Sequence, residues 1–228
     1  MPDLLEFGGW ALSDLLSEPL RAQLSSVANH VRYHDGKLIH SRGEVKPGLS
    51  IIQTGAVRFA NPGIDGAYAT TSTLGAGHCF GEATLFARLP RTYDAIAVGD
   101  TVIEQITKPK FDRLFVAEPE LARALLISTT RRLYGALEFL DDLRNLPLDV
   151  RTAKLLASML AASRKEGVVQ CTQTDLAFTL GVTRVSVGTA LRKLQKEGIL
   201  TLHYGRIKTP DKNKLYAWLE KRSALIPR

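Results

Sequence analysis

Cysteine is scarce in this 228-residue sequence, which contains only Cys79 and Cys171. Two cysteines so far apart make no disulfide framework, and they are too few for a four-thiolate iron–sulfur cluster within one chain. This cysteine usage suits a reducing cytoplasm, where we expect the protein to act. The sequence also lacks an apolar run approaching ~18 residues and a basic segment at its start, so we expect neither a membrane span nor a signal peptide.

Patterns typical of enzymes are also missing. We find no nucleophile–base arrangement and no Walker-type loop, and we therefore predict that the protein is not an enzyme. His78 and Cys79 adjoin each other and suggest a haem or redox site at first sight. Neighbouring residues on a strand point to opposite faces and cannot easily share a metal, so we expect a turn histidine, a small core cysteine and no metal site.

The charge is unevenly distributed along the chain. Residues 1–146 hold 15 basic against 17 acidic side chains, a balance of −2, whereas residues 147–228 hold 15 against 6, a balance of +9. A short basic run is usually only a solvated surface, but here the excess spans a whole predicted domain. We therefore expect the second part of the chain to meet a polyanion.

The first part of the chain is predicted to be a helix followed by a β-rich domain. Residues 13–30 favour a helix, with Ser17 as its cap and Pro19 in its first turn. His34–Lys37 is a hairpin signal, and further glycine-containing turns follow at short intervals. The segments between them predict strands at 49–53, 56–60, 68–74, 94–98 and 101–107. Many short strands at this spacing indicate a small antiparallel barrel or roll, followed by a short helix at 110–116.

One long helix is predicted from Pro119 to Asn145, with Glu118 and Glu120 at its positive end. It carries an a/d seam over three heptads, which predicts a two-helix coiled coil. The seam consists of Leu126, Thr129, Leu133, Ala136, Leu140 and Leu143. A second apolar row, comprising Leu121, Leu125 and Leu137, is expected to pack the helix onto its own domain, although a core helix of a single domain remains the alternative.

The basic part predicts a helix-turn-helix. Thr172 and Asp175 resemble a capping box, Gly181 makes the turn, and Thr183 caps a second helix that ends at Gly198. Residues 199–208 could form a small hairpin, or wing. We therefore predict three parts: an effector domain at 1–118, a dimerisation helix at 119–146 and a DNA-binding domain at 147–228.

A β-roll, a long helix and a basic winged helix-turn-helix, in that order, resemble the Crp/Fnr family of bacterial transcription regulators. The most telling segments are Phe80-Gly81-Glu82-Ala83-Thr84-Leu85-Phe86 through Pro90-Arg91-Thr92, and Gly181-Val182-Thr183-Arg184 through Val187-Gly188. The first segment is similar to the phosphate-binding cassette of cyclic-nucleotide-binding domains. The resemblance implies an α+β fold with a jelly-roll effector domain, a homodimer, double-stranded DNA with a palindromic operator as ligand, and RNA polymerase as a protein partner.

The cassette also has a chemical rationale of its own. A cyclic phosphodiester suits the guanidinium of Arg91, the hydroxyl of Thr92 and the backbone N–H groups at Gly81–Ala83. Glu82 would repel a bare phosphate, but it could accept a hydrogen bond from a ribose 2′-hydroxyl. The alternative is that Glu82 and Arg91 form a structural salt bridge.

The base end of the proposed ligand departs from the pattern of cyclic-AMP-responsive members, which place hydroxyl residues on the long helix. Alignment through Arg131-Arg132-Leu133 puts Ala136 and Leu137 at those positions, and neither side chain can donate or accept a hydrogen bond. Cyclic AMP is therefore the first choice of effector and another nucleotide the second, while a vestigial pocket remains possible. No obligatory cofactor is expected.

The second helix of the motif is expected to read DNA. Arg184 is the strongest base-reading candidate, since its fork matches the O6 and N7 atoms of guanine. Val185 could pack on a thymine methyl group, and Arg192, Lys193 and Lys196 are expected on phosphates. The remaining DNA candidates are Thr172, Thr183, Ser186 and Thr189.

The favoured function is thus a homodimeric, sequence-specific transcription regulator controlled by a small effector. One alternative is a regulator of the same kind with another effector or with a vestigial pocket. Another is a cyclic-nucleotide-binding regulatory subunit that acts on a protein partner, but this would leave the basic domain unexplained. The sequence does not distinguish an activator from a repressor.

Overall fold

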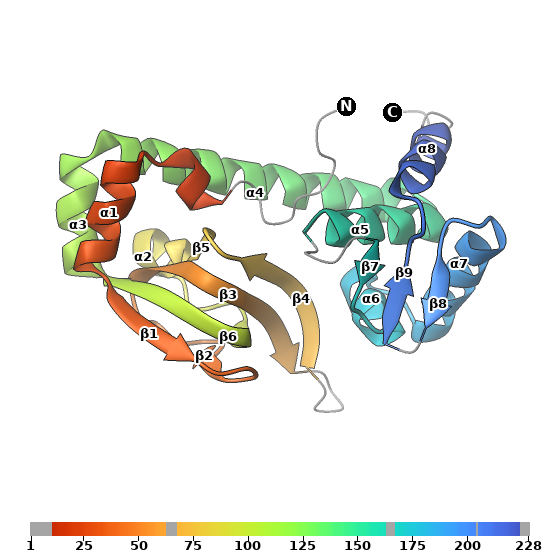
Figure 1. The fold of residues 1–228 in the computed structure, drawn as a ribbon, viewed down its shortest axis with the longest axis horizontal. Helices are drawn as coiled ribbons and strands as arrows, with labels where there is room; N and C mark the ends of the chain where they lie inside the picture. The colour runs from red at the N-terminus through yellow and green to blue at the C-terminus, as the bar shows by residue number, and fades with distance from the viewer. Residues whose placement is uncertain (1–10, 63–67, 163–166, 204, 224–228) are drawn as a thin grey trace. The chain divides into compact units, whose positions relative to one another are not determined.

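The computed structural model describes residues 11–62, 68–162, 167–203 and 205–223. The fold is α+β, as predicted, and the described chain divides into two compact units, residues 11–133 and residues 134–223. The boundary between the units falls inside helix α4, which runs from Pro119 to Asn145, the limits predicted from the sequence (Figure 1).

The first unit is an antiparallel β-roll. Its strands are β1 (Asn29–Tyr33), β2 (Leu38–His40), β3 (Gly48–Pro62), β4 (Tyr68–Gly75), β5 (Cys79–Phe80) and β6 (Asp94–Thr107). Its helices before α4 are the 3-10 helix η1 (Leu12–Leu15), α1 (Glu18–Val27), α2 (Glu82–Ala87) and α3 (Lys108–Ala117). Strand β6 pairs with β1, β2 and β3, and β3 pairs in turn with β4 and β5 (Figure 1).

Two predicted pairs of strands are each a single long strand. Segments 49–53 and 56–60 form β3, because Gly55 makes a bulge with φ +80° instead of a turn. Segments 94–98 and 101–107 likewise form β6, through Gly99 at φ +69°. The turn at His34–Lys37 forms as predicted, but the flanking strands β1 and β2 both pair with β6 and not with each other, because β6 is long enough to hold both.

The predicted N-terminal helix is divided into η1 and α1. Proline disfavours helical geometry in the residue before it and lacks an N–H donor, so Pro19 fits only at the start of α1. Ser17 is the N-cap residue, but its hydroxyl donates to Glu120 Oε2 at 2.9 Å and does not cap the helix. This contact joins the start of α1 to the first turn of α4.

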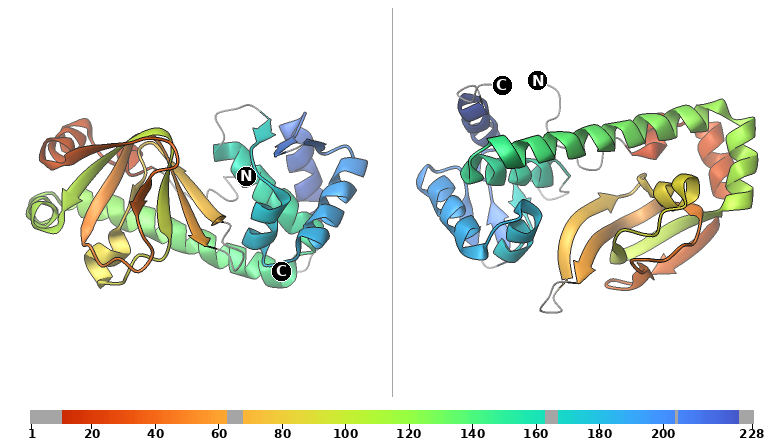
Figure 2. Two further views of the ribbon diagram at one scale, coloured as in Figure 1. Left: turned by 90° about the horizontal axis from the view of Figure 1, so that it is seen from below. Right: turned by 180° about the vertical axis from the view of Figure 1, so that it is seen from behind.

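Two clusters of buried side chains form the core of the first unit. One lies within the roll and includes Ile52, Phe59, Phe80 and Ile103. The other lies where η1, α1, α3 and the first half of α4 pack at one end of the roll, an arrangement that Figure 2 shows from two further sides. Phe111 of α3 is 1% exposed in this second cluster.

The first half of α4 packs inward through Leu121, Ala124, Leu125 and Ser128, all buried. The expectation that Leu137 continues this row is wrong, since Leu137 is 55% exposed. The reason is geometric: at about 100° per residue, twelve residues after Leu125 bring the side chain roughly 120° away from it. The predicted seam residues Leu126, Leu133 and Leu140 are 69%, 59% and 48% exposed in the single chain.

The second unit is a winged helix-turn-helix. After the end of α4 it contains α5 (Leu148–Ala162), β7 (Val168–Val169), α6 (Gln173–Leu180), α7 (Arg184–Lys196), β8 (Thr201–His203), β9 (Arg206–Lys208) and α8 (Lys212–Ser223). Strand β9 pairs with β7 and β8 to form the wing, whose Tyr204 lies outside the described residues. One continuous core joins these elements, with Leu156, Leu176, Val187, Leu191 and Leu194 each at most 1% exposed.

Candidate functional site

The cassette predicted from the sequence forms a sharp junction between β5 and α2. Gly81 has φ +107°, a conformation that favours glycine. A Cβ atom at this position would lie 2.5 Å from the Gly48 carbonyl oxygen and 2.6 Å from Arg91 Nη1. Glycine is therefore required here, and its absence of a side chain lets the guanidinium of Arg91 lie against the start of α2.

Arg91 is a partly buried cation with unused hydrogen-bonding capacity. Its Nη2 donates to the Lys46 carbonyl oxygen at 3.3 Å, while its Nε is buried without a hydrogen-bond partner in the protein. Burial lowers the pKa of Arg91, and the carboxylates of Glu82 and Glu44 oppose this shift. A desolvated guanidinium with spare donors is suited to an anion such as a phosphate.

Glu82 pairs with Arg132, a residue outside the predicted site. Its Oε1 accepts from Arg132 Nη1 at 2.9 Å and from the Cys79 thiol at 3.0 Å. Arg132 Nη2 also donates to the Cys79 carbonyl oxygen at 2.8 Å. In the described part of the chain, no salt bridge joins Glu82 to Arg91, the alternative left open above.

The Glu82–Arg132 pair links the cassette to α4. Burial lowers the pKa of Arg132, but the charges of Glu82 and Cys79 and the hydrogen bonds to both residues together outweigh burial, and the pKa is raised. Arg132 is not among the predicted effector residues. Its place four residues after the buried Ser128 extends the inward row of α4, and this spacing could have indicated its role.

The other predicted effector residues are less enclosed. Ala83 and Thr92 are exposed. Ala136 and Leu137 lie on α4 in the second unit, and both are exposed. Gly81, Glu82 and Arg91 are the partly buried members of the predicted set in the first unit, and the fold adds Cys79 and Arg132 to them.

His78 and Cys79 have different surroundings. The Cys79 side chain is fully buried, and burial followed by the charge of Glu82 raises the pKa of its thiol. His78 Nδ1 lies 3.2 Å from the Gly75 carbonyl oxygen in the turn before β5. Across the segments that the structure describes, no group of three or more His, Cys, Asp or Glu side chains could hold a metal ion.

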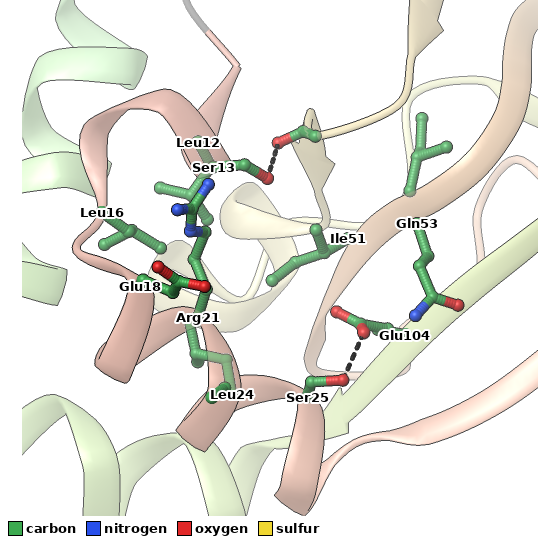
Figure 3. Close-up of a pocket in the computed structure, with 13 residues that line it drawn as sticks. Leu12, Ser13, Leu16, Glu18, Arg21, Leu24, Ser25, Ile51, Gln53 and Glu104 are labelled. Atoms are coloured by element: carbon green, nitrogen blue, oxygen red, sulfur yellow. Dashed lines mark hydrogen bonds between the residues drawn. The ribbon is translucent and has the colours of Figure 1, made fainter.

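A separate cavity of about 480 Å³ lies between the η1–α1 segment and strands β3 and β6 (Figure 3). Leu12, Leu16 and Ile51 contribute apolar wall, while Ser25 donates to the Glu104 carboxylate at 2.6 Å. Ser13 Oγ donates to the Gly77 carbonyl oxygen at 3.1 Å on another side. None of the predicted effector residues lines this cavity.

In the second unit, both helices of the motif are capped as predicted. Thr172 Oγ1 accepts from the Asp175 N–H at 3.1 Å, and the Asp175 carboxylate accepts from the Thr172 N–H at 2.9 Å, which completes the capping box. Gly181 ends α6 in the left-handed conformation, with φ 65°. Thr183 caps α7 by accepting from the Ser186 N–H at 3.1 Å.

Helix α7 presents one face to its own core and leaves the other exposed. Val187, Leu191 and Leu194 are buried, as predicted, whereas Arg184 and Val185 are exposed, Val185 by 76%. Thr183 and Ser186 share a hydrogen bond of 2.9 Å between their hydroxyls. The first turn of α7 therefore offers a guanidinium and an apolar side chain to a ligand.

The remaining basic candidates differ in their surroundings. Arg192, Lys193 and Lys196 are all exposed, and Arg192 Nη2 donates to Thr189 Oγ1 at 3.1 Å. Lys193 instead forms an ion pair with Asp149 near the start of α5. None of the helices among the described residues combines the length and the apolar composition that a membrane span requires.

Comparison with known proteins agrees with both units. Residues 30–118 match the cyclic nucleotide-binding domain family and residues 150–218 the Crp-like helix-turn-helix domain family. The Cyclic AMP receptor protein of Thermus thermophilus is 29% identical over 182 residues, covering 78% of this chain and 82% of that protein. The HTH-type transcriptional regulator Cmr of Mycobacterium tuberculosis is 25% identical over 205 residues, covering 88% of this chain and 82% of the other.

A solved structure extends the comparison. A transcriptional regulator of the CRP/FNR family from Thermus thermophilus is similar with a TM-score of 0.70 and 25% identity, covering 85% of this chain and 100% of that chain. The two matched domains occur here in the order that the sequence predicts, and together they take up more than half of the chain. The chain therefore belongs to the Crp/Fnr family of transcription regulators, with a cyclic nucleotide-binding domain followed by a Crp-like helix-turn-helix.

Proposed function

We propose that the protein is a homodimeric regulator whose binding to a palindromic DNA site is controlled by a cyclic nucleotide in the first unit. The observation that carries the proposal is the arrangement around Gly81. Arg91 keeps spare donors for a phosphate, while Glu82 is held by Arg132 and can accept from a ligand hydroxyl. An anion and a hydroxyl on one small molecule are the features of a cyclic ribonucleotide.

Cyclic AMP is the effector we propose first, in line with relatives named as a cyclic AMP receptor protein and as a cAMP-activated global transcriptional regulator. The proposed base-contacting positions Ala136 and Leu137 offer no hydrogen-bonding side chain, so the base is read by shape at most. Another nucleotide is the second candidate. A regulator with a vestigial pocket is the third, and a regulatory subunit acting on a protein partner is the candidate from a different class.

The dimer is proposed to form along α4. Leu126, Leu133 and Leu140 recur every seven residues and expose large apolar side chains in the single chain, a pattern typical of a coiled-coil seam. We propose the three-part division at 118 and 146 on the same basis, with α4 as the dimerisation helix. Such a dimer would place two α7 helices about 34–36 Å apart, one turn of DNA, where the complex could meet RNA polymerase in the cytoplasm.

The effector proposal is tested by measuring DNA affinity at fixed salt with and without cyclic AMP and cyclic GMP. Arg91→Leu is expected to lose nucleotide binding in calorimetry while the fold is kept, since a lost charge-assisted phosphate contact costs on the order of 1.5–3 kcal/mol or more. If the wild-type protein binds DNA but neither nucleotide, the pocket is vestigial. If it binds a nucleotide but no DNA, the regulatory-subunit alternative is supported.

The dimer proposal is tested by replacing both Leu133 and Leu140 with Asp. Repelling charges at successive seam positions should give monomers in sedimentation and weaken binding to a palindromic site. Asp substitution at two exposed polar positions of the same helix, Thr130 and Asn145, serves as the matched control. An intact dimer in the Leu133/Leu140 variant would rule out the coiled-coil seam.

A further inference from the structure

The last turn of α7 is tied to two other helices of its unit. Lys193 Nζ donates to Asp149 Oδ2 in an ion pair, and the Asp149 side chain is only 8% exposed in the first turn of α5. Glu197, the C-cap residue of α7, accepts from the Trp218 Nε1–H of α8. The end of the recognition helix is thus held from both sides.

Arg222 of α8 joins these two contacts into one network. Its Nη2 lies 3.1 Å from each carboxylate oxygen of Glu197, and its Nη1 lies 3.7 Å from Asp149 Oδ2. The guanidinium also stacks over the Trp218 ring at 4.7 Å from its centroid. Lys193 is therefore one of two cations on a single buried carboxylate, in a network that spans α5, α7 and α8.

The first turn of α7 has no comparable anchor in the described part of the second unit. Thr183 and Ser186 bond only within the turn, and Arg184 and Val185 are exposed. Lys193 and Lys196 are both exposed, the Lys193 side chain by 51%, but Lys196 forms no salt bridge with any described residue. The two lysines were assigned the same role from the sequence, but their surroundings are different.

The pKa of Asp149 agrees with a stable ion pair to Lys193. Burial raises its pKa, but the hydrogen bond and charge of Lys193 together with backbone N–H donors outweigh this, and the pKa is lowered. The carboxylate is therefore ionised at neutral pH. Because this carboxylate already balances the charge of the Lys193 ammonium, contact of that ammonium with a DNA phosphate releases fewer counterions than contact of a lysine without an ion pair.

We infer that Lys193 is a positioning residue: it anchors the recognition helix to Asp149 through the α8-braced network and does not act as a phosphate ligand. The inference rests on the proposed function, in which the exposed residues of α7, Arg184 and Val185 among them, contact DNA; we call them the DNA-reading face of α7. Loss of a phosphate contact lowers affinity for all sequences alike and flattens the salt dependence. Loss of an anchor lets the reading residues shift, which weakens the operator more than other DNA.

The test compares Lys193→Met with Lys196→Met in the full-length protein. The operator is a duplex that the wild-type protein selects from a random library. A scrambled duplex of equal length is the reference. For Lys196→Met we expect both affinities to fall alike and the slope of log K against log salt to shrink by about 0.9. For Lys193→Met we expect an unchanged slope and a preferential loss of operator affinity of about 3–10-fold, in the range of lost single contacts.

Two further variants separate anchoring from a loss of folding. Asp149→Asn should likewise weaken the operator preferentially, and at least as much as Lys193→Met does, because Asp149 also contacts Arg222. Adding Lys193→Met to Asp149→Asn should cause no further loss, because the Lys193–Asp149 pair is already broken. Lys193→Arg should retain the operator preference, since the charge is kept. Circular dichroism at the assay temperature shows that each variant is folded.

A slope that shrinks by about 0.9 in Lys193→Met, with equal losses on both duplexes, would overturn the inference and restore Lys193 as a phosphate ligand. Additive losses in the Lys193/Asp149 double variant would also overturn it. An unchanged slope in Lys196→Met would instead refute the proposed DNA-reading face of α7, and the inference with it.

Discussion

The two units of this protein hold their candidate binding residues in opposite ways. In the first unit the polar residues of the cassette are partly buried and bonded to distant parts of the chain, as Glu82 is to Arg132. In the second unit Arg184 and Val185 project from a capped helix turn without distant partners in the described residues. A pocket for a small ligand needs groups set in place before binding, whereas a surface that meets DNA needs exposed groups on a rigid helix.

The largest expected effect comes from a substitution in the cassette, whose polar groups are held in place before a ligand binds. Gly81→Ala should destabilise the first unit by about 3 kcal/mol or more, because a Cβ would overlap the Gly48 carbonyl oxygen and the Arg91 guanidinium in a left-handed conformation. Denaturant unfolding measures the change.

Gly36→Ala is the matched control for that change. Gly36 also has a positive φ, +74°, but nothing lies within 4 Å of its Cβ position. Only the backbone term, about 1–2 kcal/mol, should remain. Equal losses of unfolding free energy in the two variants would show that the close approach of Gly48 and Arg91 to Gly81 does not contribute to the effect.

The next effect concerns the exposed face of α7. Arg184→Ala should leave the unfolding free energy almost unchanged, since the side chain is exposed, and should weaken operator binding by about 1–3 kcal/mol with a relaxed guanine requirement. The neighbouring position should favour thymine through Val185. Binding-site selection measures both, and an Arg184→Ala variant that keeps the wild-type sequence preference would contradict the assignment.

A smaller effect concerns how the stability of the first unit depends on pH, through His40. Burial and then the charge of Arg91 lower the pKa of His40 in the roll to about 4, from 6.5. An unfolded chain then binds more protons than the folded one between these values, so the stability that neutral His40 contributes is complete above pH 6.5 and is lost as the pH falls toward 4.

Denaturant unfolding at about pH 7 and about pH 5 measures this dependence, which we expect to be on the order of 1–2 kcal/mol. His40→Leu should reduce it, because the variant has no group to protonate there. An unaltered pH dependence in His40→Leu would assign the acid sensitivity to other groups.

Sequence reasoning succeeded where short-range contacts decide the structure. The limits of α4, the capping box of Thr172 and Asp175, the Thr183 cap and the inward face of α7 are all as predicted. Each depends on hydrogen bonds or side-chain rows within a few residues, as in the Asp175–Thr172 bond across three positions. Such patterns are written in the local order of residue types.

The tertiary structure alone decided the partners of the charged residues. Glu82 binds Arg132, 50 positions away, and not Arg91, while Lys193, although exposed, binds Asp149, 44 positions away. The tertiary structure also merged the predicted strand pairs into β3 and β6, and it left Leu137 exposed. Charge and hydropathy at one position do not say which distant residue the packing of helices and strands brings within about 3 Å, the distance at which a hydrogen bond forms.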